Sequence, residues 1–163
     1  MQFVVFILTF FVLAFNVVGY GYFFAKNLTA YNKSPNIGYM GLYGITFLTL
    51  ISYLTNLILK HDYTHNFIIQ IIGIFFFFYY FSSIKNLKQN RDIKYLLFFL
   101  TLSITSILYF KSHDDFLYYH LSFIDNLTIN KVEFGLGNFD LAFNHVSSLF
   151  FFHSLFKLSF TEN

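Results

Sequence analysis

Long runs of apolar residues dominate the chain, and short polar stretches separate them. Four of these runs are uncharged and lie at residues 2–25, 37–59, 67–84 and 95–110. A bilayer core about 30 Å thick needs roughly 20 apolar residues of helix, because a helix satisfies its own backbone polar groups in lipid. The pattern therefore predicts an all-α integral membrane protein with four transmembrane helices.

The first run has the features of a retained span rather than of a signal peptide. No basic residue precedes its apolar stretch, which is longer than the roughly 7 to 15 residues of a signal-peptide core. Gly19 and Gly21 lie near its end. Such small residues permit close contact with another helix, although they are common in spans of every kind.

The lysine and arginine residues between the runs predict the orientation. Short cytoplasmic loops carry an excess of basic residues. If the loops after the first and third runs are cytoplasmic, six basic residues lie inside and two outside. The amino terminus and the segment after residue 110 are then extracytoplasmic. The six are Lys26, Lys33, Lys85, Lys88, Arg91 and Lys94, and the two are Lys60 and Lys111.

Residues 111–140 form a polar region, which this orientation puts at the outer face. They include five of the eight acidic residues of the chain. Ser112 and Asp115 have the spacing of a helix capping box, with Asp in place of the usual Glu or Gln, and residues 116–127 follow with an amphipathic pattern. We expect a helix on the membrane surface there.

A glycine-rich turn separates this region from a last apolar run at residues 139–160. Gly135, Gly137 and Asn138 are the residue types that most easily take positive φ angles. The run itself is either a fifth span that faces protein or an interfacial helix, because it contains polar groups that are costly in lipid. These groups are Asn144, His145, His153 and Lys157.

The predicted parts of the chain are a four-span bundle at 1–110, an acidic extracytoplasmic loop at 111–140, and the fifth span or interfacial helix at 141–163. Together they amount to one incomplete domain. Composition agrees with a membrane protein: 56% of residues are hydrophobic and 11% charged, against roughly 25% charged in soluble domains. The net charge of +2 excludes a nucleic-acid partner, and the absence of cysteine excludes thiol chemistry.

The densest group of chemically active residues follows the fourth run. It contains His113, Asp114, Asp115, Tyr118, Tyr119 and His120. One carboxylate can act as a general base or metal ligand, and His120 can bind a phosphate or carry a proton. The alternative is that the acids favour a helix amino terminus and the Tyr rings lie among lipid headgroups.

Two further groups have weaker patterns. His61, Asp62 and His65 include an i, i+4 histidine pair, but zinc sites normally have three or four protein ligands, so the pattern favours a solvated loop. The turn at Gly135 and Gly137 can form a backbone cradle for a phosphate, or an ordinary turn.

The stretch HDDFLYYHLSFIDNLTINKVEFGLGNFDLAFNHVSSLFFFHSLF, at residues 113–156, resembles the outer loop and following segment of large bacterial membrane proteins related to GT-C type glycosyltransferases. The acidic pair with the downstream Tyr119 and His120, and the turn that contains Gly135, carry the resemblance. Members of that class are several times longer. The resemblance therefore implies the amino-terminal portion of a multi-pass protein of the bacterial inner membrane.

The resemblance also implies a reaction, the transfer of a sugar from a polyprenyl-phosphate donor to a cell-envelope acceptor. Asp114 or Asp115 would be the base, and His120 would lie near the donor phosphate. The substrate-binding residues would be His113, Tyr119, Gly135, Gly137 and Asn138.

Several questions stay open at this stage. A divalent metal is an option as cofactor, although no metal ligands are assigned. The expected partners are membrane lipid and further transmembrane helices, from this polypeptide or another. The competing hypothesis is a non-catalytic membrane subunit or structural protein.

Overall fold

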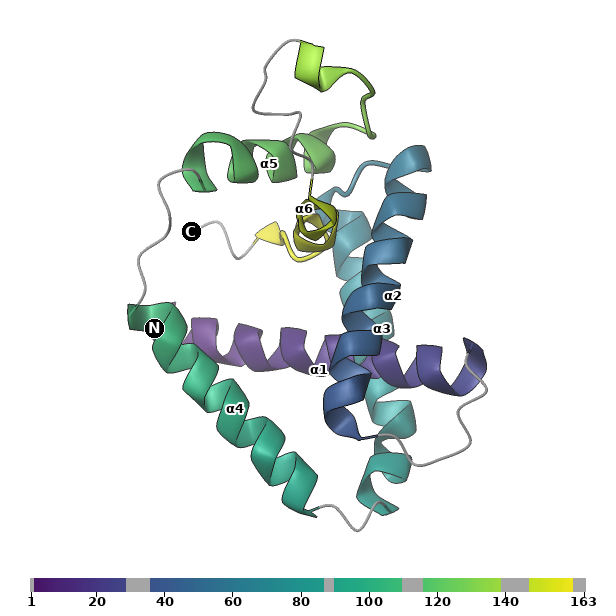
Figure 1. Cartoon of the computed structure of the whole chain (residues 1–163), viewed down its shortest axis with the longest axis vertical. Coiled ribbons are helices and arrows are strands. Elements are labelled where there is room, and N and C mark those ends of the chain that lie inside the picture. Colours follow the sequence, from purple (N-terminus) through teal and green to yellow (C-terminus); the bar gives the residue numbers. More distant parts are fainter. Residues whose placement is uncertain (1, 29–35, 87–89, 110–115, 139–146, 160–163) are drawn as a thin grey trace. The chain divides into compact units, whose positions relative to one another are not determined.

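A computed structural model describes residues 2–28, 36–86, 90–109, 116–138 and 147–159. Every regular element within these residues is a helix (Figure 1), which confirms the all-α prediction. Four long helices contain the described residues of the predicted spans, apart from residue 59. These helices are α1 (Gln2–Leu28), α2 (Ile37–Ile58), α3 (Tyr63–Asn86) and α4 (Asn90–Tyr109).

Two of the long helices are apolar and long enough to cross a membrane by length and composition. These are Phe3–Asn27, within α1, and Ile37–Ile58, which is α2. A shorter apolar stretch, Lys94–Tyr109, lies in α4. Two membrane-spanning candidates are therefore established on these criteria.

The contacts between Cα atoms divide the chain into two compact units. The first unit contains residues 1–47 and 70–111, and the second contains residues 48–69 and 112–163. Helices α2 and α3 therefore contribute to both units. The division predicted from the sequence at residue 110 follows the ends of the apolar runs and remains a prediction.

In the first unit, α1 packs closely against α2 and α3 through glycine. A Cβ atom on Gly21 would lie 1.7 Å from the Met40 carbonyl oxygen, and one on Gly19 would lie 2.2 Å from that of Gly73. Glycine is therefore required at these contacts, because no side chain fits. Aromatic rings fill the space beside them: Phe23 and Phe76 stack with centroids 4.4 Å apart.

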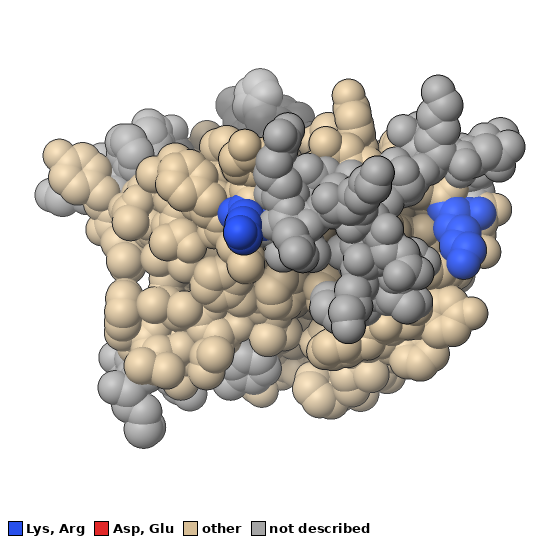
Figure 2. Space-filling model, turned by 90° about the horizontal axis from the view of Figure 1, so that it is seen from below, with Lys and Arg blue, Asp and Glu red and all other residues tan. Residues whose placement is uncertain are grey.

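One face of the molecule is visible in Figure 2, seen from below relative to Figure 1. Among the residues described there, basic side chains are visible and acidic ones are not. The rest of the described surface in this view is uncharged. A face of this kind fits a membrane protein whose few charges are unevenly distributed.

The second unit contains the remaining helices, which are short. They are η1 (Phe116–His120), a π-helical turn, α5 (Leu121–Ile129), the 3-10 turn η2 (Leu136–Asn138) and α6 (Ser148–Ser154). The helix predicted at 116–127 is confirmed as η1 followed by α5. It is amphipathic, since α5 buries Phe123, Ile124 and Leu127 against Phe150 and Phe151 of α6.

The described part of the run at 139–160 does not form one continuous helix. Ser147 has extended backbone angles, with φ −91° and ψ 139°, and its side chain caps α6. The helix that follows has 7 residues, or roughly 10 Å at 1.5 Å per residue, against about 30 Å of hydrocarbon. Of the two alternatives, α6 thus fits a short packed or interfacial helix and not a fifth span.

Candidate functional site

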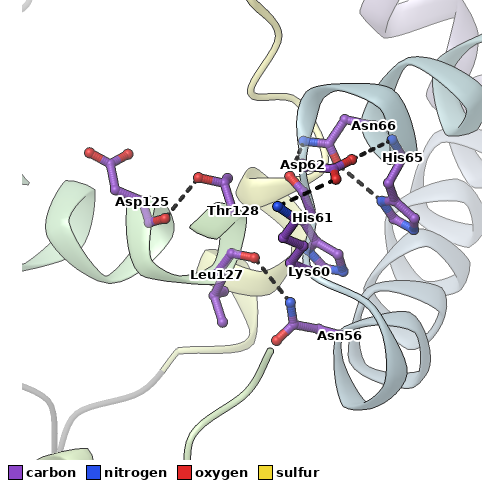
Figure 3. Close-up of polar contacts among 9 residues, drawn as sticks. All are labelled: Asn56, Lys60, His61, Asp62, His65, Asn66, Asp125, Leu127 and Thr128. Carbon is purple, nitrogen blue, oxygen red and sulfur yellow. Dashed lines mark hydrogen bonds and ion pairs between the residues drawn. The ribbon is translucent and has the colours of Figure 1, made fainter. Parts of the chain in front are cut away.

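The end of α2 is joined to the segment after α5 by a buried asparagine. The Asn56 side chain is fully buried, and its Nδ2 donates to the Leu127 carbonyl oxygen at 3.1 Å. The backbone carbonyl oxygen of Asn56 accepts from the Val132 backbone N–H at 3.2 Å. The His61 N–H also donates to the Leu127 carbonyl oxygen, at 2.9 Å. The contacts of Asn56 and Leu127 (Figure 3) hold residues 127–132 against the α2–α3 turn.

His61 lies inside this turn, so the prediction of a solvated loop is wrong for it. Its side chain is fully buried, with Nδ1 2.6 Å from Ser154 Oγ and Nε2 3.0 Å from Thr55 Oγ1. Burial, and secondarily the neighbouring His65, lower the pKa of His61 to about 4. The imidazole is therefore neutral at pH 7, and it links α2 to α6 through two hydroxyl groups.

A second buried asparagine joins the start of α3 to α6. Asn66 Nδ2 lies 2.9 Å from the His61 carbonyl oxygen, 2.8 Å from that of Ser154 and 2.9 Å from that of Lys157. An amide group has two N–H donors, so these three acceptors share them. The network satisfies carbonyl oxygens at the end of α6 that the helix itself leaves without partners.

Asp62 caps α3, and His65 packs beside His61. Asp62 Oδ1 accepts from the His65 backbone N–H at 2.9 Å, in the manner of an N-cap residue. The rings of His61 and His65 stack with centroids 4.9 Å apart. No group of three or more His, Cys, Asp or Glu side chains in the described residues could hold a metal ion. This arrangement therefore supports a structural role for the histidine pair.

A pocket of about 410 Å³ lies next to this network, and we call it the Gly135 pocket. Its apolar wall includes Tyr53, whose ring stacks on Phe151 at 4.2 Å between centroids. Its polar residues include Glu133 and Asn138. The lining residues are Tyr53, Leu57, Phe123, Val132, Glu133, Phe134, Gly135, Leu136, Gly137, Asn138 and Phe151.

The turn at the pocket confirms one sequence prediction about glycine. Gly135 has φ 88°, and it alone among the described residues has a positive φ. The Asn138 backbone N–H donates to the Gly135 carbonyl oxygen at 2.9 Å and closes the turn. Gly135, Gly137 and Asn138, predicted to bind substrate, therefore share one pocket.

Of the other predicted site residues, Tyr119 and His120 are described, and neither lines the Gly135 pocket. Tyr119 and His120 lie on η1, and the His120 ring packs 4.8 Å from that of Phe150 and 4.2 Å from that of Tyr119. His113, Asp114 and Asp115 lie outside the described residues, as does the capping box that includes Ser112. Their predicted roles stay predictions.

Sequence reasoning missed Glu133 and the buried network. Glu133 follows α5 by a few residues and has no motif around it. Asn56 and Asn66 lie at equal distances in sequence on either side of His61. This grouping of amide and imidazole side chains between two apolar runs is the sequence feature that could have indicated a buried polar cluster.

Comparison with known proteins gives a family and no function. No curated protein and no solved structure matches the chain. A family described as a domain of unknown function (DUF8201) matches residues 3–163. Since this match covers nearly the whole sequence, the chain belongs to the DUF8201 family.

Proposed function

We propose that the chain is a multi-pass protein of the bacterial inner membrane and that α1 to α4 all cross the bilayer. Large apolar side chains are exposed on each of these helices: Phe3 is 56% exposed, Leu54 63%, Phe78 69% and Phe98 60%. Soluble proteins rarely expose so much contiguous apolar surface. Helix α3 has 24 residues, or roughly 36 Å, which suffices for a bilayer core. The apolar part of α4, Lys94–Tyr109, is shorter, so α4 would cross with its charged first turn at the membrane surface.

The contacts of the second unit support the crossing of α3 and α4. Asn56 and His61 bind the backbone of Leu127, and two segments joined in this way must lie on one side of the membrane. This requires an even number of crossings between them, as α3 and α4 would provide. The positive-inside rule alone puts this side at the outer face.

We further propose that the Gly135 pocket binds the sugar of a polyprenyl-phosphate donor, and that the complete protein transfers this sugar to a cell-envelope acceptor. The observation that carries the proposal is that Gly135, Gly137 and Asn138 line one pocket with Glu133 and aromatic residues. Its volume of about 410 Å³ is within the usual range for small-molecule sites, roughly 300 to 1,000 Å³. Few polar groups among apolar walls are also typical of such sites.

The proposed chemistry assigns the base to Asp114 or Asp115. The oxygen of an acceptor hydroxyl forms a bond to the anomeric carbon, while the bond from that carbon to the phosphate oxygen breaks. The carboxylate takes the hydroxyl proton, and the polyprenyl phosphate leaves with the bonding electron pair. Attack opposite the leaving group inverts the anomeric centre, and His120 stabilises the leaving phosphate.

The Glu133→Gln variant tests the pocket through binding alone. We expect it to weaken binding of a polyprenyl-phosphate sugar by about tenfold, since a hydrogen bond to a charged group contributes about 1.5 to 3 kcal/mol. Binding is measured by native mass spectrometry on the detergent-solubilised chain. Ser122→Ala is the matched control, because Ser122 is exposed on α5 outside the pocket. Equal binding by Glu133→Gln and the parent chain would contradict the assignment.

The acidic pair is tested in the longest form of the protein that transfers sugar. We expect Asp114→Asn or Asp115→Asn to lower turnover about 10² to 10⁴-fold, the usual contribution of a general base, without a change in membrane abundance. Full transfer by both variants would leave helix capping as the role of these residues.

A non-catalytic membrane subunit is the second candidate, and one observation favours it. In the first unit, a pocket of about 810 Å³ is lined mainly by apolar residues of α2 and α4, among them Ile37, Tyr95, Phe98 and Phe99, together with Asn36 and Lys94. A surface of this kind suits another transmembrane helix. Co-purification of a specific membrane partner with a chain that binds no polyprenyl-phosphate sugar would favour this function.

A further inference from the structure

A second pocket in the second unit is basic at its rim and apolar within. It has a volume of about 770 Å³, and we call it the Lys60 pocket. Its apolar wall is formed by Ile58, Leu59, Ile68 and Ile129. Its charged and polar groups include Lys60, Asp62, His65 and Lys131.

The buried network brings the two lysines to this pocket from distant parts of the sequence. Lys60 follows α2, and Lys131 follows α5. The bonds from Asn56 and His61 to Leu127, and from Val132 to Asn56, fix both segments beside each other. The two ammonium groups therefore share one pocket as a consequence of the fold.

The balance of charge in the pocket is positive. Lys60 Nζ lies 3.8 Å from Asp62 Oδ2, with the two side chains 54% and 41% exposed, so this pair is weak. The other oxygen of Asp62 caps α3. Lys131 forms no ion pair with any residue that the structure describes. The pocket thus contains two lysines and one aspartate, and that carboxylate already has a structural role.

A buried nitrogen beside the pocket also lacks a partner. His65 Nε2 is buried and has no hydrogen-bond partner within the described part of the chain, whereas its Nδ1 lies 3.2 Å from Asn66 Oδ1. Buried polar atoms in native proteins are nearly always paired, with protein, water or ligand.

The position of the pocket along α2 indicates where it lies in a bilayer. Helix α2 has 22 residues, or roughly 33 Å, close to the thickness of the hydrocarbon core. Lys60 follows the last residue of α2 by two positions, so its ammonium group reaches the headgroup level. The isoleucine and leucine side chains on the pocket wall then face the acyl chains.

We propose that the Lys60 pocket binds the phosphate group of an anionic membrane lipid. Lys60 and Lys131 pair with the phosphate oxygens, and the lipid chains lie along Ile58, Leu59, Ile68 and Ile129. Charge complementarity and the coincidence of basic rim and apolar wall favour a lipid over a free anion. The proposal rests on α2 crossing the membrane, but it is independent of sugar binding in the Gly135 pocket.

Native mass spectrometry of the full chain in mild detergent tests this directly, with phosphatidylglycerol and phosphatidylcholine as probes. We expect preferential binding of phosphatidylglycerol, and about tenfold weaker binding in Lys60→Gln and in Lys131→Gln, since each loses one charge-assisted contact. Lys60→Arg retains the charge and should retain binding. The Asp62→Asn variant keeps a capping side chain and should bind phosphatidylglycerol more tightly.

Lys26→Gln is the matched control, because Lys26 lies at the end of another candidate span, outside the pocket. It should leave phosphatidylglycerol binding unchanged. Equal losses in Lys26→Gln and Lys60→Gln, or equal binding of the two lipids, would overturn the proposal. Inorganic phosphate at concentrations matched to the lipid should not displace it, and full displacement would identify a free-phosphate site instead. This experiment does not measure sugar transfer. A negative result for the Lys60 pocket therefore does not affect the proposal that the Gly135 pocket binds a sugar.

Discussion

At the residue scale, the polar side chains that matter most for the second unit are buried at the ends of α2 and α3. Asn56, His61 and Asn66 are each fully buried, and each bonds to backbone or hydroxyl groups far along the sequence. An unpaired buried amide costs about 1 to 3 kcal/mol. These three residues therefore determine which backbone segments can lie against the turn.

The neutral state of His61 imposes a definite hydrogen-bond pattern. A neutral imidazole has one donor and one acceptor nitrogen, so of its two hydroxyl neighbours one accepts and the other donates to the ring. Thr55 Oγ1 also lies 2.9 Å from the Ile51 carbonyl oxygen, and Ser154 Oγ lies 2.7 Å from that of Phe151. The hydroxyl that donates to the ring must give up its carbonyl contact. Protonation would free both hydroxyls to donate to the carbonyls, at the cost of burying a charge.

The low pKa of His61 predicts that acid destabilises the second unit. The folded pKa of His61, about 4, is below the unfolded value of about 6.5. The stabilisation from keeping His61 neutral is complete above about pH 6.5 and is lost as the pH falls towards 4, by at most about 3 kcal/mol. Histidine NMR signals of the detergent-solubilised chain should show one imidazole that titrates near pH 4 and disappears in His61→Gln. If the signal that disappears in His61→Gln titrated near pH 6.5, the prediction would be contradicted.

At the scale of elements, long apolar runs could be predicted from the sequence and the contacts between them could not. The four runs were located because a helix in lipid needs roughly 20 apolar residues wherever it packs. The partners of the network around His61 could not be predicted in this way. Leu127 and Ser154 are far from His61 in sequence, and no periodic pattern of residues links them to it. The π-helical turn at 116–120 was also missed, because an amphipathic pattern does not distinguish a π turn from an α turn. The acidic pair at 114–115 has no structural test, since it lies outside the described residues.

The contact between α1 and α2 gives a prediction about glycine. A Cβ atom on Gly21 would lie 1.7 Å from the Met40 carbonyl oxygen, so Gly21→Ala must push the helices apart. Overpacking of this kind typically costs 1 to 3 kcal/mol. Gly41→Ala is the control, because its Cβ would meet nothing within 4 Å, and alanine favours a helix over glycine by up to about 1 kcal/mol.

Thermal unfolding in one detergent compares the two variants. We expect Gly21→Ala to unfold at a lower temperature than the parent chain and Gly41→Ala to unfold at the same or a higher temperature. If Gly21→Ala were as stable as Gly41→Ala, the close approach of α1 and α2 would not exist in the membrane protein.

At the scale of the whole molecule, charge and contacts answer two different questions about topology. The bonds between the α2–α3 turn and residues 127–132 require both segments to lie on one side of a membrane. The bias of six basic residues against two in the loops next to the four runs predicts which side that is. The expectation that the second unit lies at the outer membrane surface therefore rests on the charge bias alone.

Single cysteines test this orientation, because the parent chain has none. We expect Asn130→Cys and Lys60→Cys to react with an impermeant maleimide in intact cells, since both side chains are exposed in the second unit. Asn90→Cys lies among the basic residues between the third and fourth runs and should react only after the membrane is permeabilised. Labelling of Asn90→Cys in intact cells would reject the charge-based orientation. Labelling of Lys60→Cys and Asn130→Cys from opposite sides would reject the fold of the second unit, because the bonds to Leu127 require both positions to lie on one side.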